Sequence, residues 1–66
     1  MKSKANNPVR ATARTYFSGY HNEDDLEIIF YDSAGRIIDK IVERENDALI
    51  QLAQASLPKG TSLEWI

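Results

Sequence analysis

The sequence predicts a small α+β domain, in which a mainly antiparallel sheet of three to four strands carries one helix on one face, in the order β-β-β-α-β. Three patterns support this prediction: alternation in residues 9–17, a turn between two β-branched runs in residues 26–43, and apolar spacing of three and four in residues 46–57. A sequence of 66 residues holds one domain at most. Because it contains no Cys and one His, neither disulfides nor a Cys/His zinc site is expected to stabilise the fold.

The N-terminal part divides into a polar arm and a strand. Residues 1–8 contain Lys, Asn, Ser and Pro, and we expect them to form a mobile arm ahead of a single domain in residues 9–66. Residues 9–17 alternate between two faces, which is typical of a half-buried strand. One face holds Val9, Ala11, Ala13, Thr15 and Phe17, and the other holds Arg10, Thr12, Arg14 and Tyr16. The polar residues 18–25 are interpreted as a connection.

The segment Asp32-Ser33-Ala34-Gly35 predicts a hairpin with a G1 bulge between strands at 26–31 and 36–43. Asp favours the first position of a type I turn, and Gly adopts the left-handed conformation after it. Pairing Asp32 with Arg36 then fixes a register and two faces. The predicted core face holds Leu26, Ile28, Phe30, Ile38 and Val42 together with Lys40, and the other face holds Ile29, Tyr31, Ile37 and Ile41 together with Glu27 and Asp39.

A short helix and a last strand complete the predicted fold. Asn46 is suited to cap the helix, and Pro58 and Gly60 end it. The apolar stripe comprises Leu49, Leu52, Ala53, Ser56 and Leu57. A helix this short requires the sheet for stability, so we expect it to pack there. Residues 61–66 predict a final strand, beside either the first or the third strand, with Trp65 as a core residue.

The face opposite the predicted core is the candidate protein-binding site. It is more apolar than a face that contacts only water, and one helix cannot cover both sides of a sheet. Tyr and Arg among aliphatic residues also match the composition of binding hot spots. The predicted protein-binding residues are Arg14, Tyr16, Ile29, Tyr31, Ile37 and Ile41. The alternative is that the arm or the last strand covers this face.

A nucleic-acid interface is the alternative function. Its predicted residues are Lys2, Lys4, Arg10 and Arg14, which precede every acid in the sequence and have aromatic neighbours in Tyr16, Phe17 and Tyr20. An excess of Asp and Glu follows in residues 21–48, however, and the net charge is −2. This is not the broadly basic surface of a dedicated nucleic-acid binder. The acidic segment is equally suited to a basic protein surface.

No catalytic residue, metal ligand or cofactor is predicted. His21 lies close to Glu23, Asp24 and Asp25, a combination that serves as a general base or metal site elsewhere. The run lacks the ligand spacing of a calcium loop, and a solvated acidic connection is the simpler interpretation. The isolated glycines form no phosphate-binding loop. The sequence therefore predicts a protein that is not an enzyme and has no small-molecule substrate.

The expected function is a small protein-binding module. No apolar run approaches the ~20 residues of a membrane span, so no membrane contact is expected, and the lack of Cys favours the cytoplasm. The expected partner is another protein or a second copy of the chain. Small proteins without motifs are often accessory regulators or inhibitors of bacterial or phage origin, which act by occluding a surface, and we assign this chain to that class.

Overall fold

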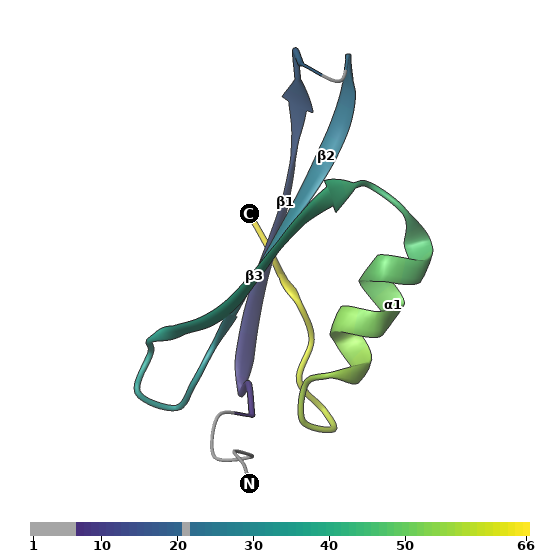
Figure 1. Ribbon diagram of the computed structural model, residues 1–66. Coiled ribbons are helices and arrows are strands. Elements are labelled where there is room, and N and C mark those ends of the chain that lie inside the picture. Colours follow the sequence, from purple (N-terminus) through teal and green to yellow (C-terminus); the bar gives the residue numbers. More distant parts are fainter. Residues whose placement is uncertain (1–6, 21) are drawn as a thin grey trace, which may run out of the picture.

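The computed structural model describes residues 7–20 and 22–66 and confirms a small α+β fold with the order β-β-β-α-β (Figure 1). The elements are β1 (Arg10–Ser18), β2 (Glu23–Tyr31), β3 (Ile37–Arg44), α1 (Asp47–Ala55) and β4 (Glu64–Trp65). They form one four-stranded sheet with the strand order β3-β2-β1-β4. β1–β2 and β2–β3 are antiparallel, and β4 lies parallel to β1. The last strand therefore adds beside the first strand.

The acidic segment after the first strand belongs to β2, so the predicted connection at 18–25 is wrong at both ends: Ser18 belongs to β1, and Glu23, Asp24 and Asp25 belong to β2. β1 and β2 pair continuously from Arg10–Tyr31 to Ser18–Glu23. The Arg44 guanidinium donates to the Glu23 carboxylate, with 2.7 Å between Nε and Oε2. Acidic residues are poor strand formers, but cross-strand ion pairs of this kind offset that preference.

The β2–β3 turn is confirmed, and a second irregularity follows it. Gly35 has a φ of 83°, and the Asp32 amide donates to the Arg36 carbonyl at 2.9 Å. Tyr31 pairs with Ile37 as expected, but Phe30 pairs with Asp39. Ile38 is therefore an extra residue in β3, a bulge that leaves two residues of one strand opposite one of the other.

This bulge corrects the predicted faces of β3. Ile41 lies opposite Ile28 on the helix side, where it packs against the core, so its assignment to the binding face is wrong. Lys40 and Val42 lie opposite Ile29 and Glu27, on the face away from α1, and both assignments to the core are wrong. Asp39 lies opposite Phe30 on the helix side, so its assignment to the other face is wrong as well. A one-residue shift moves every later side chain to the other face, because side chains alternate along a strand.

The core lies between α1 and one face of the sheet. Its buried members are Ala11, Ala13, Leu26, Ile28 and Phe30 from the sheet, Ala53 and Leu57 from the helix and its end, and Leu63 before β4. Small Ala side chains on both layers allow the short helix to approach the sheet closely. Trp65, which the sequence predicts as a core residue, is exposed, and Leu63 is buried instead.

The helix begins as the sequence predicts. The Asn46 side chain accepts a hydrogen bond from the Leu49 amide at 2.7 Å, which satisfies one of the unpaired donors of the first turn. Leu49, Ala53 and Leu57 face the core, together with Ile50, which the predicted stripe omitted. Leu52 was included in the stripe but is 66% exposed.

The turn glycine provides a first test of the fold. Gly35→Val places a β-branched residue at positive φ and is expected to cost about 1–2 kcal/mol or more. Gly19→Val is the matched control, because a Cβ at either glycine meets no atom within 4 Å and only Gly35 has positive φ. Urea unfolding should show a lower midpoint for Gly35→Val alone. Equal midpoints for the two variants would refute the bulged turn.

Candidate protein-binding face

The open face is defined here as the side of the sheet that points away from α1. Of the predicted protein-binding residues, the structure brings together Arg14, Tyr16, Ile29, Tyr31 and Ile37 on this face. Only Ile41 lies elsewhere, beneath the helix layer. Val42 belongs to the open face and was missed, because its position depends on the Ile38 bulge, for which the sequence carries no recognisable signal.

A shared carboxylate crosses the middle of the open face. Glu27 on the central strand β2 receives Arg14 from β1, with Nε and Oε1 2.5 Å apart, and Lys40 from β3, with Nζ and Oε2 3.2 Å apart. The hydrogen bond from Arg14, followed by that from Lys40, holds the pKa of Glu27 below its ordinary value of 4.5. The Glu27 side chain is only 10% exposed, so this ion pair is better shielded from water than a typical surface pair.

Two further ion pairs join neighbouring strands at the borders of the open face. Arg10 on β1 binds Glu64 on β4 in a bidentate manner, with Nε–Oε2 and Nη2–Oε1 distances of 2.8 and 2.9 Å. The Arg10 hydrogen bond lowers the pKa of Glu64. At the β2–β3 border, Arg44 pairs with Glu23 as described above. Each of the four cations described on this face is therefore in an ion pair, and Arg14 and Lys40 share the carboxylate of Glu27.

Two arginines of the open face also stack on tyrosines. The guanidinium of Arg10 lies 4.8 Å from the centre of the Tyr31 ring, and that of Arg14 lies 4.8 Å from the centre of the Tyr16 ring. Each arginine is thus held by both a carboxylate and a ring. Side chains that are already ordered lose less conformational freedom when a partner binds.

Aliphatic side chains lie between these polar groups. Ile37, at the start of β3, is 61% exposed, and Val42, near its end, is 44% exposed. Ile29 lies between them on the central strand and is partly buried. The open face therefore combines exposed aliphatic carbon, ordered Tyr and Arg side chains, and cations that are held in ion pairs.

The predicted nucleic-acid residues are only partly placed. Lys2 and Lys4 lie outside the described residues, as does His21. Arg10 and Arg14 lie on the open face, but both are engaged by carboxylates. A phosphate group that approached either arginine would have to displace Glu64 or Glu27 and would meet their negative charge.

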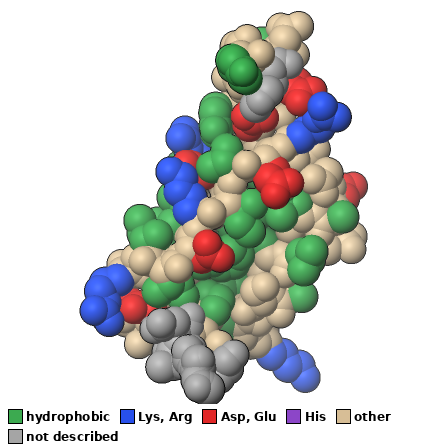
Figure 2. Space-filling model, in the orientation of Figure 1, with side chains coloured by type: hydrophobic (Ala, Val, Ile, Leu, Met, Phe, Trp, Pro, Cys, Tyr) green, Lys and Arg blue, Asp and Glu red, His purple; other side chains and the backbone are tan. Residues whose placement is uncertain are grey.

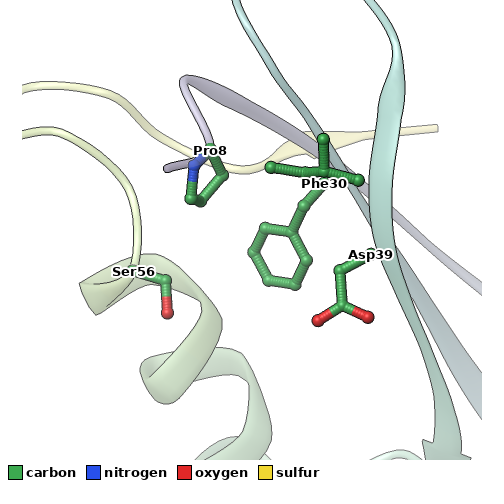
Figure 3. A pocket seen from close by; sticks show the side chains of 5 residues that line it. Pro8, Phe30, Asp39 and Ser56 are labelled. Carbon is green, nitrogen blue, oxygen red and sulfur yellow. The ribbon is translucent and has the colours of Figure 1, made fainter. Parts of the chain in front are cut away.

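Two other kinds of site, a metal centre and a small-molecule pocket, can be compared with the described residues. No group of three or more His, Cys, Asp or Glu side chains suited to a metal ion occurs among them. A cavity of about 240 Å³ is lined by Pro8, Phe30, Ile38, Asp39 and Ser56 (Figure 3). Pockets for small-molecule ligands typically measure about 300–1,000 Å³. Within residues 7–20 and 22–66, no helix is long and apolar enough to cross a membrane.

Comparison with protein-family models, with curated proteins and with solved structures found no match to this chain.

The Glu27 ion pairs predict a pH dependence of stability. Because the pKa of Glu27 is lowered in the folded state, its contribution is present above 4.5 and is lost as pH falls through the folded pKa. Glu27→Gln should lower the free energy of unfolding at pH 7 and reduce its further decline in acid. Glu64→Gln is the matched control and should have a smaller effect, since its side chain is 50% exposed. Urea titrations from pH 7 to pH 3 measure both quantities. Indistinguishable profiles for the two variants would show that the shared carboxylate has no special role.

Proposed function

We propose that this chain is a non-enzymatic protein-binding module whose open face docks onto a protein partner or onto a second copy of the chain. One observation carries the proposal. In the described part of the chain, α1 covers one face of the four-stranded sheet, and the other face, with Ile29, Tyr31, Ile37 and Val42, is left without a covering element.

The composition of the open face suits a protein better than a polyanion. Desolvated interface centres are depleted in unpaired charge and enriched in Tyr, Arg and aliphatic carbon. Here the charges of Arg14 and Lys40 are already satisfied by Glu27. A partner surface that covers the aliphatic residues therefore meets cations that are already in ion pairs, and an unpaired buried charge, which would cost several kcal/mol, is avoided most fully where the partner supplies one further carboxylate.

The proposed mode of action is occlusion of a partner's surface. A module without catalytic groups alters its partner by covering a site or by changing the partner's assembly, as accessory regulators and inhibitors do. A Cys-free chain has no need of an oxidising compartment, and we place the protein in the cytoplasm as part of the proposal.

Nucleic-acid binding through the open face is the second candidate function. Its support is the pair of arginines stacked on tyrosines on a sheet surface, since rings and guanidinium groups provide platforms for bases. The bound carboxylates of Glu27 and Glu64 oppose it. The two functions differ in their dependence on salt and on Arg14.

The experiment compares two substitutions of one kind on opposite sides of the molecule. Ile37→Asp places a charge on the open face, and the control Gln51→Asp places one on the exposed side of α1, and both should fold. Sedimentation and affinity capture with quantitative mass spectrometry should show that Ile37→Asp loses self-association or its specific partner by about tenfold or more. DNA and RNA should show no retardation at physiological salt. Wild-type behaviour of Ile37→Asp in both assays would contradict the proposal, and retardation abolished by Arg14→Ala would establish the second function.

A further inference from the structure

The helix α1 is attached to one side of the sheet. The Gln54 side chain donates to the carbonyl of Thr61 and accepts from the amide of Leu63, at 3.1 Å for the latter bond. These bonds hold one flank of α1 against the segment that enters β4. Four strands span about 14 Å at 4.8 Å spacing, whereas a helix with its side chains is about 10 Å wide. On the face of the sheet that α1 covers, the part over β3 is therefore covered less completely than the part next to β4.

The uncovered strip forms a groove between β3 and α1. Ile38 and Ile41 of β3 and Leu49 of α1 contact the core but are only partly buried. Leu52 follows Leu49 by about one helical turn and lies on the side of α1 opposite Gln54. Its side chain is 66% exposed. We name the surface formed by Ile38, Ile41, Leu49 and Leu52 the β3–α1 groove.

A cavity lies between the start of β3 and the end of α1. Ile38 and Asp39 of β3, Phe30 of β2, Ser56 after α1 and Pro8 before β1 line it, so it adjoins the β3–α1 groove at Ile38. Figure 3 shows the Phe30 ring and the Asp39 carboxylate directed toward this space. Figure 2 shows hydrophobic side chains gathered in the middle of one side of the molecule, with Asp and Glu as well as Lys and Arg side chains around them.

Three carboxylates lie beside the β3–α1 groove. Asp39 and Glu43 lie opposite Phe30 and Leu26, which places both on the helix side of β3, and Asp47 begins α1. Among the described residues, none of these three carboxylates is in a salt bridge, in contrast to Glu23, Glu27 and Glu64 of the open face. A cationic partner is therefore complementary to the β3–α1 groove.

The edge of β3 favours a helix over an added strand as the occupant. Asp39 accepts a hydrogen bond from the Lys40 amide at 2.8 Å through its own side chain, so that amide is already engaged. The Ile38 bulge and the charged residues along β3 are further features that discourage strand addition at a sheet edge. A helix needs no backbone partner and requires only an apolar surface for its stripe.

We propose that the β3–α1 groove docks an amphipathic helix of a protein partner, which lies beside α1 as a second helix on the sheet and carries Lys or Arg on the flank next to Asp39 and Glu43. This site is distinct from the open face and does not depend on the function proposed for that face. Leu52 supplies the exposed apolar contact, and the unpaired acids select a basic sequence.

The test uses two synthetic peptides of about 15–20 residues, a length at which helices become marginally stable. Both carry Leu at helical spacing; one has Lys at the remaining positions and the other has Glu. Fluorescence anisotropy of the labelled peptides should show binding of the Lys peptide only. Leu52→Asp should weaken it by about tenfold, as should the double variant Asp39→Lys and Glu43→Lys. Ile37→Asp, on the open face, should bind like the wild type.

The Leu52→Asp result separates docking from simple charge attraction. This variant is more negative than the wild type, so attraction alone predicts tighter binding of the Lys peptide, whereas docking in the groove predicts weaker binding. Tighter or unchanged binding by Leu52→Asp would overturn the proposal, as would equal binding of the two peptides or no binding of the Lys peptide. Circular dichroism of each variant verifies that a loss of binding does not reflect unfolding.

Discussion

Leu26→Asp is expected to abolish folding, whereas Ile37→Asp should leave the domain folded. Leu26 is fully buried between the sheet and α1, with 0% exposure, while Ile37 is 61% exposed on the open face. An unpaired carboxylate in the core costs several kcal/mol, and small domains have only about 5–15 kcal/mol of stability in total. Far-UV circular dichroism and urea unfolding of the two variants measure the difference.

The comparison also defines which face of the sheet is core. Phe30→Asp should behave like Leu26→Asp, because Phe30 is buried on the same face, and Ile29→Asp should be the milder substitution on the central strand. If Ile37→Asp and Ile29→Asp unfolded the protein as completely as Leu26→Asp, the open face would be covered in solution, and the proposed docking surface would not exist.

Ile41→Asp is expected to destabilise the domain strongly, while Val42→Asp should have little effect. The Ile38 bulge turns Ile41 toward the core opposite Ile28 and turns Val42 to the open face opposite Glu27. A charge at this partly buried apolar site should lower the free energy of unfolding by about 1–3 kcal/mol or more. A β3 strand without the bulge predicts the reverse order, so the relative urea midpoints of these adjacent variants decide between the two registers.

The features predicted correctly are those encoded by a few neighbouring residues. The Asp32–Gly35 turn depends on a side-chain acceptor and a glycine at fixed spacing, and the start of α1 depends on the capping side chain of Asn46. In both segments the local preference of the chain agrees with the tertiary structure. The order of the elements follows, because each was recognised from its own period or boundary.

The features predicted incorrectly depend on contacts between distant segments. With the bulge at Ile38, Ile41 packs against the core and Lys40 reaches Glu27. Both contacts depend on tertiary packing and not on the local sequence of β3. The acidic start of β2 is a strand through its pairing with β1 and Arg44. For the candidate binding face, the sequence identified five of its residues but not the ion pairs that neutralise it, because these join four different strands.

The most direct test of the account is the solvent exposure of isoleucine methyl groups in the isolated domain, measured by NMR line broadening with a soluble paramagnetic chelate. The central claim is that one face of the sheet packs in the core and the other face is exposed to solvent. The account predicts strong broadening for Ile37, weaker broadening for Ile29 and Ile41, and protection of Ile28, which is fully buried. Protection of Ile37 and Ile29 equal to that of Ile28 in the monomer would contradict the claim, because it would mean that the chain itself covers the open face.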